Sequence, residues 1–379
     1  MADVSGNCDA RFAPLRTVLA DQLDSGNELG ASIVVDIDGD TVVDIWGGWC
    51  DANHRSPWNE NTITNVWSTT KTVTNLAALM LVDRGLLDPY SPVAKYWPEF
   101  AENGKENIEV RHILSHTSGV SGWETPFAVA DMYDWGSSTT KLASQAPWWE
   151  PGTASGYHAQ NQGHLVGELV RRVTGKHLKT FVADEIAGPL GADFQIGAAE
   201  SDWDRIAPVV PPPPLPFDLD AIDKNGPAFK TFTGPVADAA AANTPGWRRA
   251  DMGAINGHGN ARSVARILKS LALGGTVDGV RLLSPETIDV IFDEQSHGTD
   301  LVLGVPLRFG IGYALPETES VPYVPQGRAC YWGGWGGSLI LMDLDSRTTI
   351  SYMMNKMGAG IIGSDRSESY ARAIHSCLD

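Results

Sequence analysis

The chain has 379 residues, 42% of them hydrophobic and 20% charged, which is a globular composition, and its length predicts two packed subdomains. The net charge of −18 would repel phosphate backbones, so nucleic acid is not expected as a partner. There is no run of 18 apolar residues and no signal-peptide pattern at the start, so we expect no membrane partner and a cytoplasmic location. Composition leaves the oligomeric state unknown.

The four cysteines lie far apart and show no CxxC spacing, so we expect four reduced thiols and no disulfide framework. The 13 tryptophans are many for this length. Tryptophan at such density lines pockets as well as cores.

The first third of the chain predicts a helix, a hairpin and a second helix of unusual character. Apolar residues from Phe12 recur at helical spacing over about 14 residues. The β-branched runs 31–37 and 41–46 are joined by Asp38-Gly39, which indicates a hairpin. From Ser68 to Gly85 the sequence is apolar on every helical face, as is typical of a helix at the centre of a fold.

Helical patterns continue to about residue 190, and strands return only near the C-terminus. The segment 208–217 contains four consecutive prolines and can be neither regular helix nor central strand. We expect helices at 160–173, 178–187 and 262–273, a helix N-terminus at Ser284-Pro285-Glu286, strands at 338–343 and 348–354, and a C-terminal helix. This order predicts a discontinuous α/β domain formed by residues 1–66 and 250–379, and a mostly helical inserted domain at 67–249.

The segment Ser68-Thr69-Thr70-Lys71 carries the first chemical signal. A serine nucleophile needs a base within hydrogen-bond reach and donors for the developing oxyanion. Three residues apart on a helix, Ser68 and Lys71 lie on one face, and the helix N-terminus favours a negative oxygen. Burial against an apolar helix would lower the pKa of Lys71, so that its neutral amine could accept a proton.

The same tetrapeptide occurs a second time, as Ser138-Thr139-Thr140-Lys141. It lies in a polar stretch with Gly136, Ser137 and Pro147, which is too short to bury a lysine. We therefore expect 138–141 to be a solvated surface segment, and we place the nucleophile at Ser68.

Further motifs follow the first tetrapeptide in a fixed order. They are residues 108–119 (IEVRHILSHTSG), Pro151-Gly152-Thr153 followed by Tyr157, Thr174-Gly175-Lys176 with Pro189-Leu190-Gly191, residues 278–285 (DGVRLLSP), and residues 309–313 (FGIGY). Together they resemble the serine β-lactamase-like superfamily, which includes class C β-lactamases, D-Ala-D-Ala peptidases and family VIII carboxylesterases. The resemblance implies a β-lactamase-like α/β fold, with an antiparallel sheet flanked by helices and an inserted helical domain.

The resemblance also implies residue roles. Ser68 would be the acylated nucleophile, Lys71 its activating amine, and Tyr157 the residue that shuttles protons to and from the leaving group. The backbone N–H groups of Ser68 and Trp335 would form the oxyanion hole.

Two positions depart from the pattern of the family's lactamases and peptidases. Ala159 stands where they have an asparagine that can bond a substrate amide, and Trp332-Gly333-Gly334 stands where they have Lys-Thr-Gly or His-x-Gly. A neutral indole thus replaces a cation that can hold a substrate carboxylate. We expect Ala159, Trp332, Gly333 and Gly334 to contact substrate, and this Trp-Gly-Gly motif resembles the family VIII carboxylesterases.

Other constellations are weaker. The sequence has no G-x-S-x-G pentapeptide, which disfavours a Ser-Asp-His esterase. His112 and His116 are four residues apart but lack the HExxH glutamate, so structural histidines are expected. Gly310-Ile311-Gly312 lacks the third glycine of a dinucleotide fingerprint. We expect no metal and no cofactor.

The sequence therefore predicts a serine hydrolase, and first of all a carboxylesterase that hydrolyses neutral small-molecule esters through an acyl-serine. An acyltransferase, which passes the acyl group to an alcohol or amine, would use the same residues and stays open. A β-lactamase or D-amino peptidase is less favoured because of Ala159 and Trp332. A binding protein without activity is disfavoured by the presence of Ser68, Lys71 and Tyr157 together.

Overall fold

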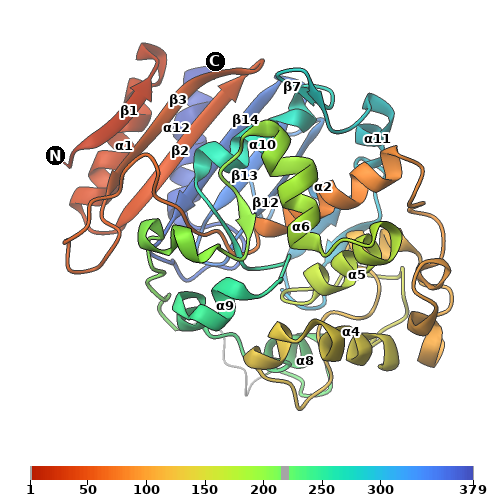
Figure 1. The fold of residues 1–379 in the computed structure, drawn as a ribbon. Coiled ribbons are helices and arrows are strands. Elements are labelled where there is room, and N and C mark those ends of the chain that lie inside the picture. The colour runs from red at the N-terminus through yellow and green to blue at the C-terminus, as the bar shows by residue number, and fades with distance from the viewer. Residues whose placement is uncertain (1, 215–221, 379) are drawn as a thin grey trace.

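The computed structural model describes residues 2–214 and 222–378, and its largest element is a nine-stranded antiparallel sheet (Figure 1). The strand order is β1-β3-β2-β14-β13-β12-β11-β10-β9. The strands are β1 Val4–Cys8, β2 Gly30–Ile37, β3 Asp40–Gly48, β9 Ser296–Thr299, β10 Pro306–Phe309, β11 Ala314–Leu315, β12 Ala329–Gly333, β13 Leu339–Asp343 and β14 Thr348–Met354. The pair β2–β14, with Ile33 opposite Tyr352, joins the two ends of the chain.

The four predicted strands are confirmed as β2, β3, β13 and β14. Asp38 and Gly39 form the turn between β2 and β3, and both have positive φ, which a tight hairpin turn requires. The sequence patterns miss β1 and β9–β12. These strands are short or rich in polar residues, so pairing with neighbours, and not their own composition, makes them strands.

Both faces of the central strands are buried, which explains their nearly continuous apolar sequence. Ile33 and Val35 of β2 face one hydrophobic cluster, and Val34 between them faces the other. Helices α1 (Ala13–Asp24) and α12 (Asp365–Leu378) cover the first face, while α10 (Ala261–Ala272) packs on β2, β13 and β14 from the other (Figure 1).

The inserted helical part lies on the α10 side of the sheet (Figure 1). Its helices are α2 Thr70–Asp83, α3 Val110–Leu114, α4 Trp135–Ser144, α5 Gln162–Thr174, α6 Leu178–Val182, α7 Gly188–Leu190, α8 Pro227–Thr233 and α9 Pro245–Arg249, and α11 Pro285–Val290 follows α10. Helix α2 contacts α5, α6, α10, α11 and β12, and nearly all of its side chains are buried, as its all-round apolar pattern predicts. The expected helix 178–187 is confirmed, and it runs from α6 through a π-helical turn at Ala183–Ala187 into α7 without a break.

A small sheet of β4 (Thr64–Asn65), β6 (Gly257–Gly259) and β5 (Gln195–Ile196) leads the chain into α2. The Pro-rich segment joins this region to the main sheet, since Val210 forms a parallel bridge with Lys356. Residues 215–217 of that segment lie outside the described residues. The division into domains at 66 and 250 stays a prediction.

Candidate active site

Ser68 lies where the chain passes from β4 into α2. The Val66 N–H donates to the Gly257 carbonyl at 2.8 Å, which fixes the end of the strand. Trp67 then adopts φ 52°, a left-handed conformation that a bulky residue rarely takes. The N–H groups of Thr70 and Lys71 donate to the Trp67 and Ser68 carbonyls, so the helical turn begins at once. The strained turn leaves Ser68 at the helix N-terminus, 7% exposed.

Lys71 is buried one turn further on, and its Nζ lies 2.9 Å from Ser68 Oγ. The same nitrogen donates to the carbonyl oxygens of Ala159 (2.8 Å) and Ala254 (3.0 Å). Burial lowers the pKa of Lys71 well below its ordinary value. A neutral amine has two N–H groups and one lone pair. The two carbonyls take the N–H groups, which leaves the lone pair to accept the Ser68 proton.

Tyr157 completes the group from the opposite side. Its ring centroid lies 4.8 Å from Lys71 Nζ, its side chain lines the same cavity as Ser68, and its hydroxyl oxygen accepts a hydrogen bond from Trp332 Nε1 at 3.1 Å. Burial raises the pKa of Tyr157, while the hydrogen bond from Trp332 acts in the opposite direction. Its backbone N–H donates to Asp300 Oδ1 at 3.0 Å, which holds the residue in place.

The turn between β12 and β13 brings Trp335 to the same place. Ser338 Oγ lies 3.0 Å from Thr69 Oγ1 and donates to the Val66 carbonyl at 3.0 Å, so this turn is tied to the Ser68 segment. A Cβ on Gly334 would lie 2.6 Å from the Val66 carbonyl oxygen, so only glycine permits this approach. Within residues 2–214 and 222–378, the backbone N–H groups of Ser68 and Trp335 donate to no acceptor.

A small cavity of about 60 Å³ opens beside Ser68 and Tyr157. Its wall is largely aromatic, because Trp67 packs edge-on against both Trp247 (5.5 Å between ring centroids) and Trp335 (5.2 Å). The remaining lining residues are Ala159, Gln160, Phe232, Ala237, Asp238, Ile255 and Ile361. Among the described residues that line it, Asp238 alone carries a charge. Ala159 lines this cavity, whereas Trp332, Gly333 and Gly334 are not among its lining residues.

Comparison with known proteins identifies the family of this chain. The family model described as Beta-lactamase matches residues 15–370. The chain belongs to the beta-lactamase family. A curated relative, "Esterase/beta-lactamase LipL" of Mycobacterium tuberculosis, is 31% identical over 96% of this chain and 86% of its own length.

Two solved structures are similar to this beta-lactamase family member along its whole length. A family VIII carboxylesterase has a TM-score of 0.92 and 37% identity, covering 99% of this chain and 100% of the other. A penicillin-binding protein homologue from Caulobacter crescentus has a TM-score of 0.90 at the same identity and coverage. The chain is therefore a hydrolase of the esterase and β-lactamase type, and the resemblance read from its motifs is confirmed.

The second Ser-Thr-Thr-Lys segment corrects one expectation. Residues 138–141 are not a solvated segment but part of α4, and Ser138 is fully buried. Ser138 Oγ donates to the Asp131 carbonyl at 2.9 Å, and Lys141 Nζ donates to the Pro126 carbonyl at 2.8 Å. The apolar face of α4, which carries Leu142, draws Ser138 into the core while Lys141 stays half-exposed.

The two histidines considered as metal ligands have other partners. His112 Nδ1 accepts a bond from the Glu109 N–H, and His116 Nδ1 accepts one from the His158 N–H, each at 3.1 Å. The His116 ring packs against Tyr157 at 5.0 Å, and its burial lowers its pKa well below the ordinary value. It therefore supports the tyrosine as a neutral ring. The part of the chain that the structure describes contains no cluster of three or more metal-ligating side chains, and none of its helices is long and apolar enough to cross a membrane.

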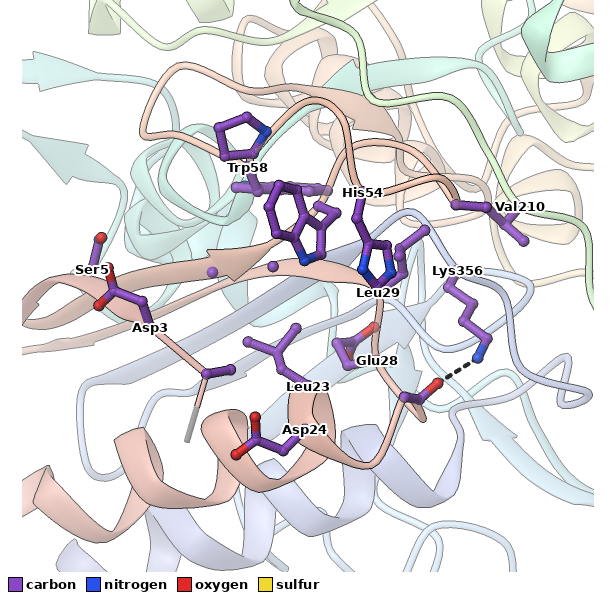
Figure 2. Close-up of a pocket in the computed structure, with 17 residues that line it drawn as sticks. Asp3, Ser5, Leu23, Asp24, Glu28, Leu29, His54, Trp58, Val210 and Lys356 are labelled. Atoms are coloured by element: carbon purple, nitrogen blue, oxygen red, sulfur yellow. Dashed lines mark hydrogen bonds between the residues drawn. The ribbon is translucent and has the colours of Figure 1, made fainter.

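A cavity larger than the one beside Ser68 lies elsewhere in the molecule. It has a volume of about 710 Å³ and is bounded by the end of α1, the edge of β1 and the loop at 49–58 (Figure 2). Trp58 and Leu23 form apolar walls, and the Lys356 side chain reaches the Gly26 carbonyl. Ser68, Lys71 and Tyr157 are not among its lining residues.

Several groups at the Ser68 site escape sequence reasoning. The Ala159 and Ala254 carbonyls and the Asp300 carboxylate come from distant parts of the chain, and nothing in their side chains signals these contacts. Phe232 and Trp247 line the cavity from a region without motifs. Only the high tryptophan content indicates that aromatic residues would form a pocket wall.

Proposed function

We propose that this hydrolase is a carboxylesterase that cleaves neutral small-molecule esters through an acyl group on Ser68. The observation that carries the proposal is the 2.9 Å contact between Ser68 Oγ and a buried Lys71 whose other two contacts are both backbone carbonyls. This arrangement supplies a nucleophile and a neutral base in one helical turn.

In the proposed acylation, Ser68 Oγ attacks the ester carbonyl carbon while Lys71 Nζ accepts the serine proton. The carbonyl oxygen becomes negative within reach of the free N–H groups of Ser68 and Trp335. The C–O bond to the alcohol then breaks, and Tyr157 gives its proton to the leaving oxygen. The proton on Lys71 returns to Tyr157. In deacylation, a water oxygen attacks the acyl carbon and gives a proton to Lys71 or Tyr157. The bond between the acyl carbon and Ser68 Oγ then breaks, Ser68 Oγ takes a proton back from this pair, and the carboxylic acid leaves.

The pocket supports a small, uncharged acyl group. A cavity of about 60 Å³ holds a few water-sized groups, and its walls are mainly indole and alkyl surface. Ala159 offers no side-chain partner for a substrate amide, and the one charged lining residue is the acidic Asp238. A carboxylate on the substrate would meet like charge there.

We therefore expect hydrolysis of short-chain p-nitrophenyl esters with weak or absent turnover of penicillins. A lost charge-assisted bond costs about 1.5–3 kcal/mol, and about 1.4 kcal/mol is a factor of ten in rate, so the missing contacts suppress β-lactam turnover strongly. Ala159→Asn combined with Trp332→Lys or Trp332→His should shift the ratio toward β-lactams. Faster penicillin than ester hydrolysis by the unmodified protein would contradict the proposed substrate class.

Acyl transfer is the second candidate, favoured by the same aromatic lining, because an alcohol with an apolar body would compete with water for such a surface. One experiment addresses both. A phosphonate or activated acyl ester should label the peptide that contains Ser68, and labelling of Ser138 instead would overturn the assignment. Product analysis of the acylated protein in water and in water–alcohol mixtures then measures how the acyl group partitions.

A further inference from the structure

Trp332 holds a different position from the one its motif suggests. Its indole Nε1 donates to the Tyr157 hydroxyl oxygen at 3.1 Å, and the two side chains are 3% and 2% exposed. Tyr157 and Ala159 line the cavity at Ser68, but Trp332 does not. The single polar group of this side chain is therefore engaged with the tyrosine and is not turned to the cavity.

The indole is held in place on several sides. Trp332 lies in β12, where it pairs with Ile340 of β13. Its ring packs against Tyr157 (5.0 Å between centroids), Phe309 (5.5 Å) and His116 (6.2 Å). Such packing fixes the direction of the N–H before any substrate arrives.

The donor-only character of indole sets the direction of the tyrosine proton. A phenol has one O–H donor and two acceptor positions, and an indole N–H can only donate. Because Trp332 occupies an acceptor position of Tyr157, the tyrosine proton must point away from the indole, and Tyr157 lines the same cavity as Ser68. The same N–H bonds a phenolate about twice as strongly as a neutral phenol.

We propose that Trp332 is a positioning residue that acts through Tyr157. It directs the tyrosine proton toward the leaving group, and it stabilises the tyrosine oxygen once that proton has been transferred to the leaving alkoxide. The indole keeps its own proton throughout. The inference rests on the proposed function, because it requires Tyr157 to protonate the leaving alcohol.

The test compares two leaving groups in the variant Trp332→Phe, which keeps an aromatic ring and deletes the N–H. An alkyl ester needs its leaving oxygen protonated, whereas p-nitrophenolate departs without a proton. For an acetyl alkyl ester kcat should fall about tenfold with KM within about twofold, and for p-nitrophenyl acetate kcat should fall less than about threefold. Equal losses on the two esters, or a change confined to KM, would overturn the proposal.

A double-mutant cycle gives an independent readout. In a Tyr157→Phe background there is no hydroxyl for the indole to bond, so adding Trp332→Phe should change the remaining rate by less than about twofold. A further tenfold loss would show that Trp332 acts on something other than Tyr157. Trp332→His retains a ring N–H and should lose less than Trp332→Phe on alkyl esters, and the opposite order would contradict the proposed role.

Two controls distinguish the proposed role of Trp332 from a general effect of tryptophan substitution and from failure of the proposed function. Trp203→Phe deletes an indole N–H that donates to the Ala198 carbonyl in another region, and it should leave both ester rates within twofold. Rates are expressed per site titrated with a phosphonate ester, so that only folded molecules are compared. Ser68→Ala tests the proposed function alone: undiminished esterase activity in that variant would overturn the function, whereas the cycle above addresses Trp332 alone.

Discussion

The chain contains the tetrapeptide Ser-Thr-Thr-Lys twice, and the serine and lysine side chains have different partners in the two copies. In the first, Lys71 Nζ lies 2.9 Å from Ser68 Oγ. In the second, both side chains turn to backbone carbonyls, Ser138 to Asp131 and Lys141 to Pro126. Four identical residues at helical spacing therefore do not define a reactive pair.

The difference originates in the surroundings of each lysine. Lys71 belongs to α2, a helix that is buried on every side. Two carbonyl groups from distant segments accept hydrogen bonds from its nitrogen, which keeps that nitrogen beside Ser68. Lys141 belongs to an amphipathic helix and lies half-exposed. Burial lowers the pKa of Lys71, so this lysine can serve as a base beside Ser68.

The largest effect is expected at the two serines. Ser68→Ala should lower kcat/KM on p-nitrophenyl acetate at least about 10⁴-fold, since it removes the nucleophile on which the other groups act. Ser138→Ala should leave kcat/KM within about twofold but cost about 1 kcal/mol of folding free energy, because a buried hydroxyl bond is lost. Steady-state kinetics and urea unfolding measure the two quantities. Comparable losses of activity in both variants would contradict the assignment of Ser68, and not Ser138, as the nucleophile.

The next effect concerns the lysines and the tyrosine. Lys71→Ala and Tyr157→Phe should each reduce kcat by orders of magnitude, and the double variant should lose little more than the worse single variant, because both groups serve the same proton transfers. Lys141→Ala provides the matched control and should retain normal turnover. If the losses at Lys71 and Tyr157 simply multiplied, the two groups would act independently and the proposed mechanism would be wrong.

The lowered pKa of Lys71 predicts that the stability of the protein depends on pH. Between the lowered pKa in the folded protein and the ordinary value near 10.5, the unfolded chain binds more protons, so the free energy of unfolding attributable to Lys71 rises with pH. Lys71→Met removes this penalty. Its stability advantage over the unmodified protein should be largest at low pH and should shrink as the pH rises toward 10.

Chemical denaturation at several pH values measures this difference. Lys141→Met should show no comparable trend. A stability difference for Lys71→Met that is flat with pH would mean that Lys71 stays protonated in the folded protein.

The smallest effect is expected at the cavity beside the first tetrapeptide. Asp238 is exposed and is the one acidic residue among the described lining residues, so its charge is partly screened by solvent. The test substrate is an acetate ester whose alcohol part carries a negative charge. For this ester Asp238→Asn should raise kcat/KM by a few-fold at low salt, and much less at high salt. Asp40→Asn, an exposed acid in the β2–β3 hairpin, is the control for net charge. A neutral ester should respond to neither change.

The sequence predicts the parts of the fold that have strong periodicity. The hairpin at β2–β3, the buried helix from Ser68 and the strands β13 and β14 follow from apolar patterns. The sequence also predicts that Ser68, Lys71 and Tyr157 lie together, because they stand in motifs that resemble those of a known family. The structure brings these three side chains together as expected, and their roles stay predictions until measured.

Contacts between distant segments could not be predicted in the same way. The carbonyl of Ala254 and the carboxylate of Asp300 reach the site through tertiary packing, and a backbone carbonyl carries no sequence signal. The position of Trp332 is a second case. Its motif suggests contact with substrate, whereas pairing of β12 with β13 turns its N–H to Tyr157. Tyr157 lies 175 residues before Trp332 in the chain, so the motif around Trp332 gives no sign of this bond.

The pairing of β2 with β14 has a consequence for how the protein is made. During synthesis β2 emerges early, with apolar side chains on both faces. The edge of β2 that pairs with β14, where Ile33 lies opposite Tyr352, has no partner until β14 has been made. One edge of β2 therefore stays unpaired until nearly the whole chain has been translated. An unpaired strand edge favours association between nascent chains. Folding to the finished sheet is a late, long-range event, and a ribosome-bound fragment that ends before β14 should depend on chaperones to remain in solution.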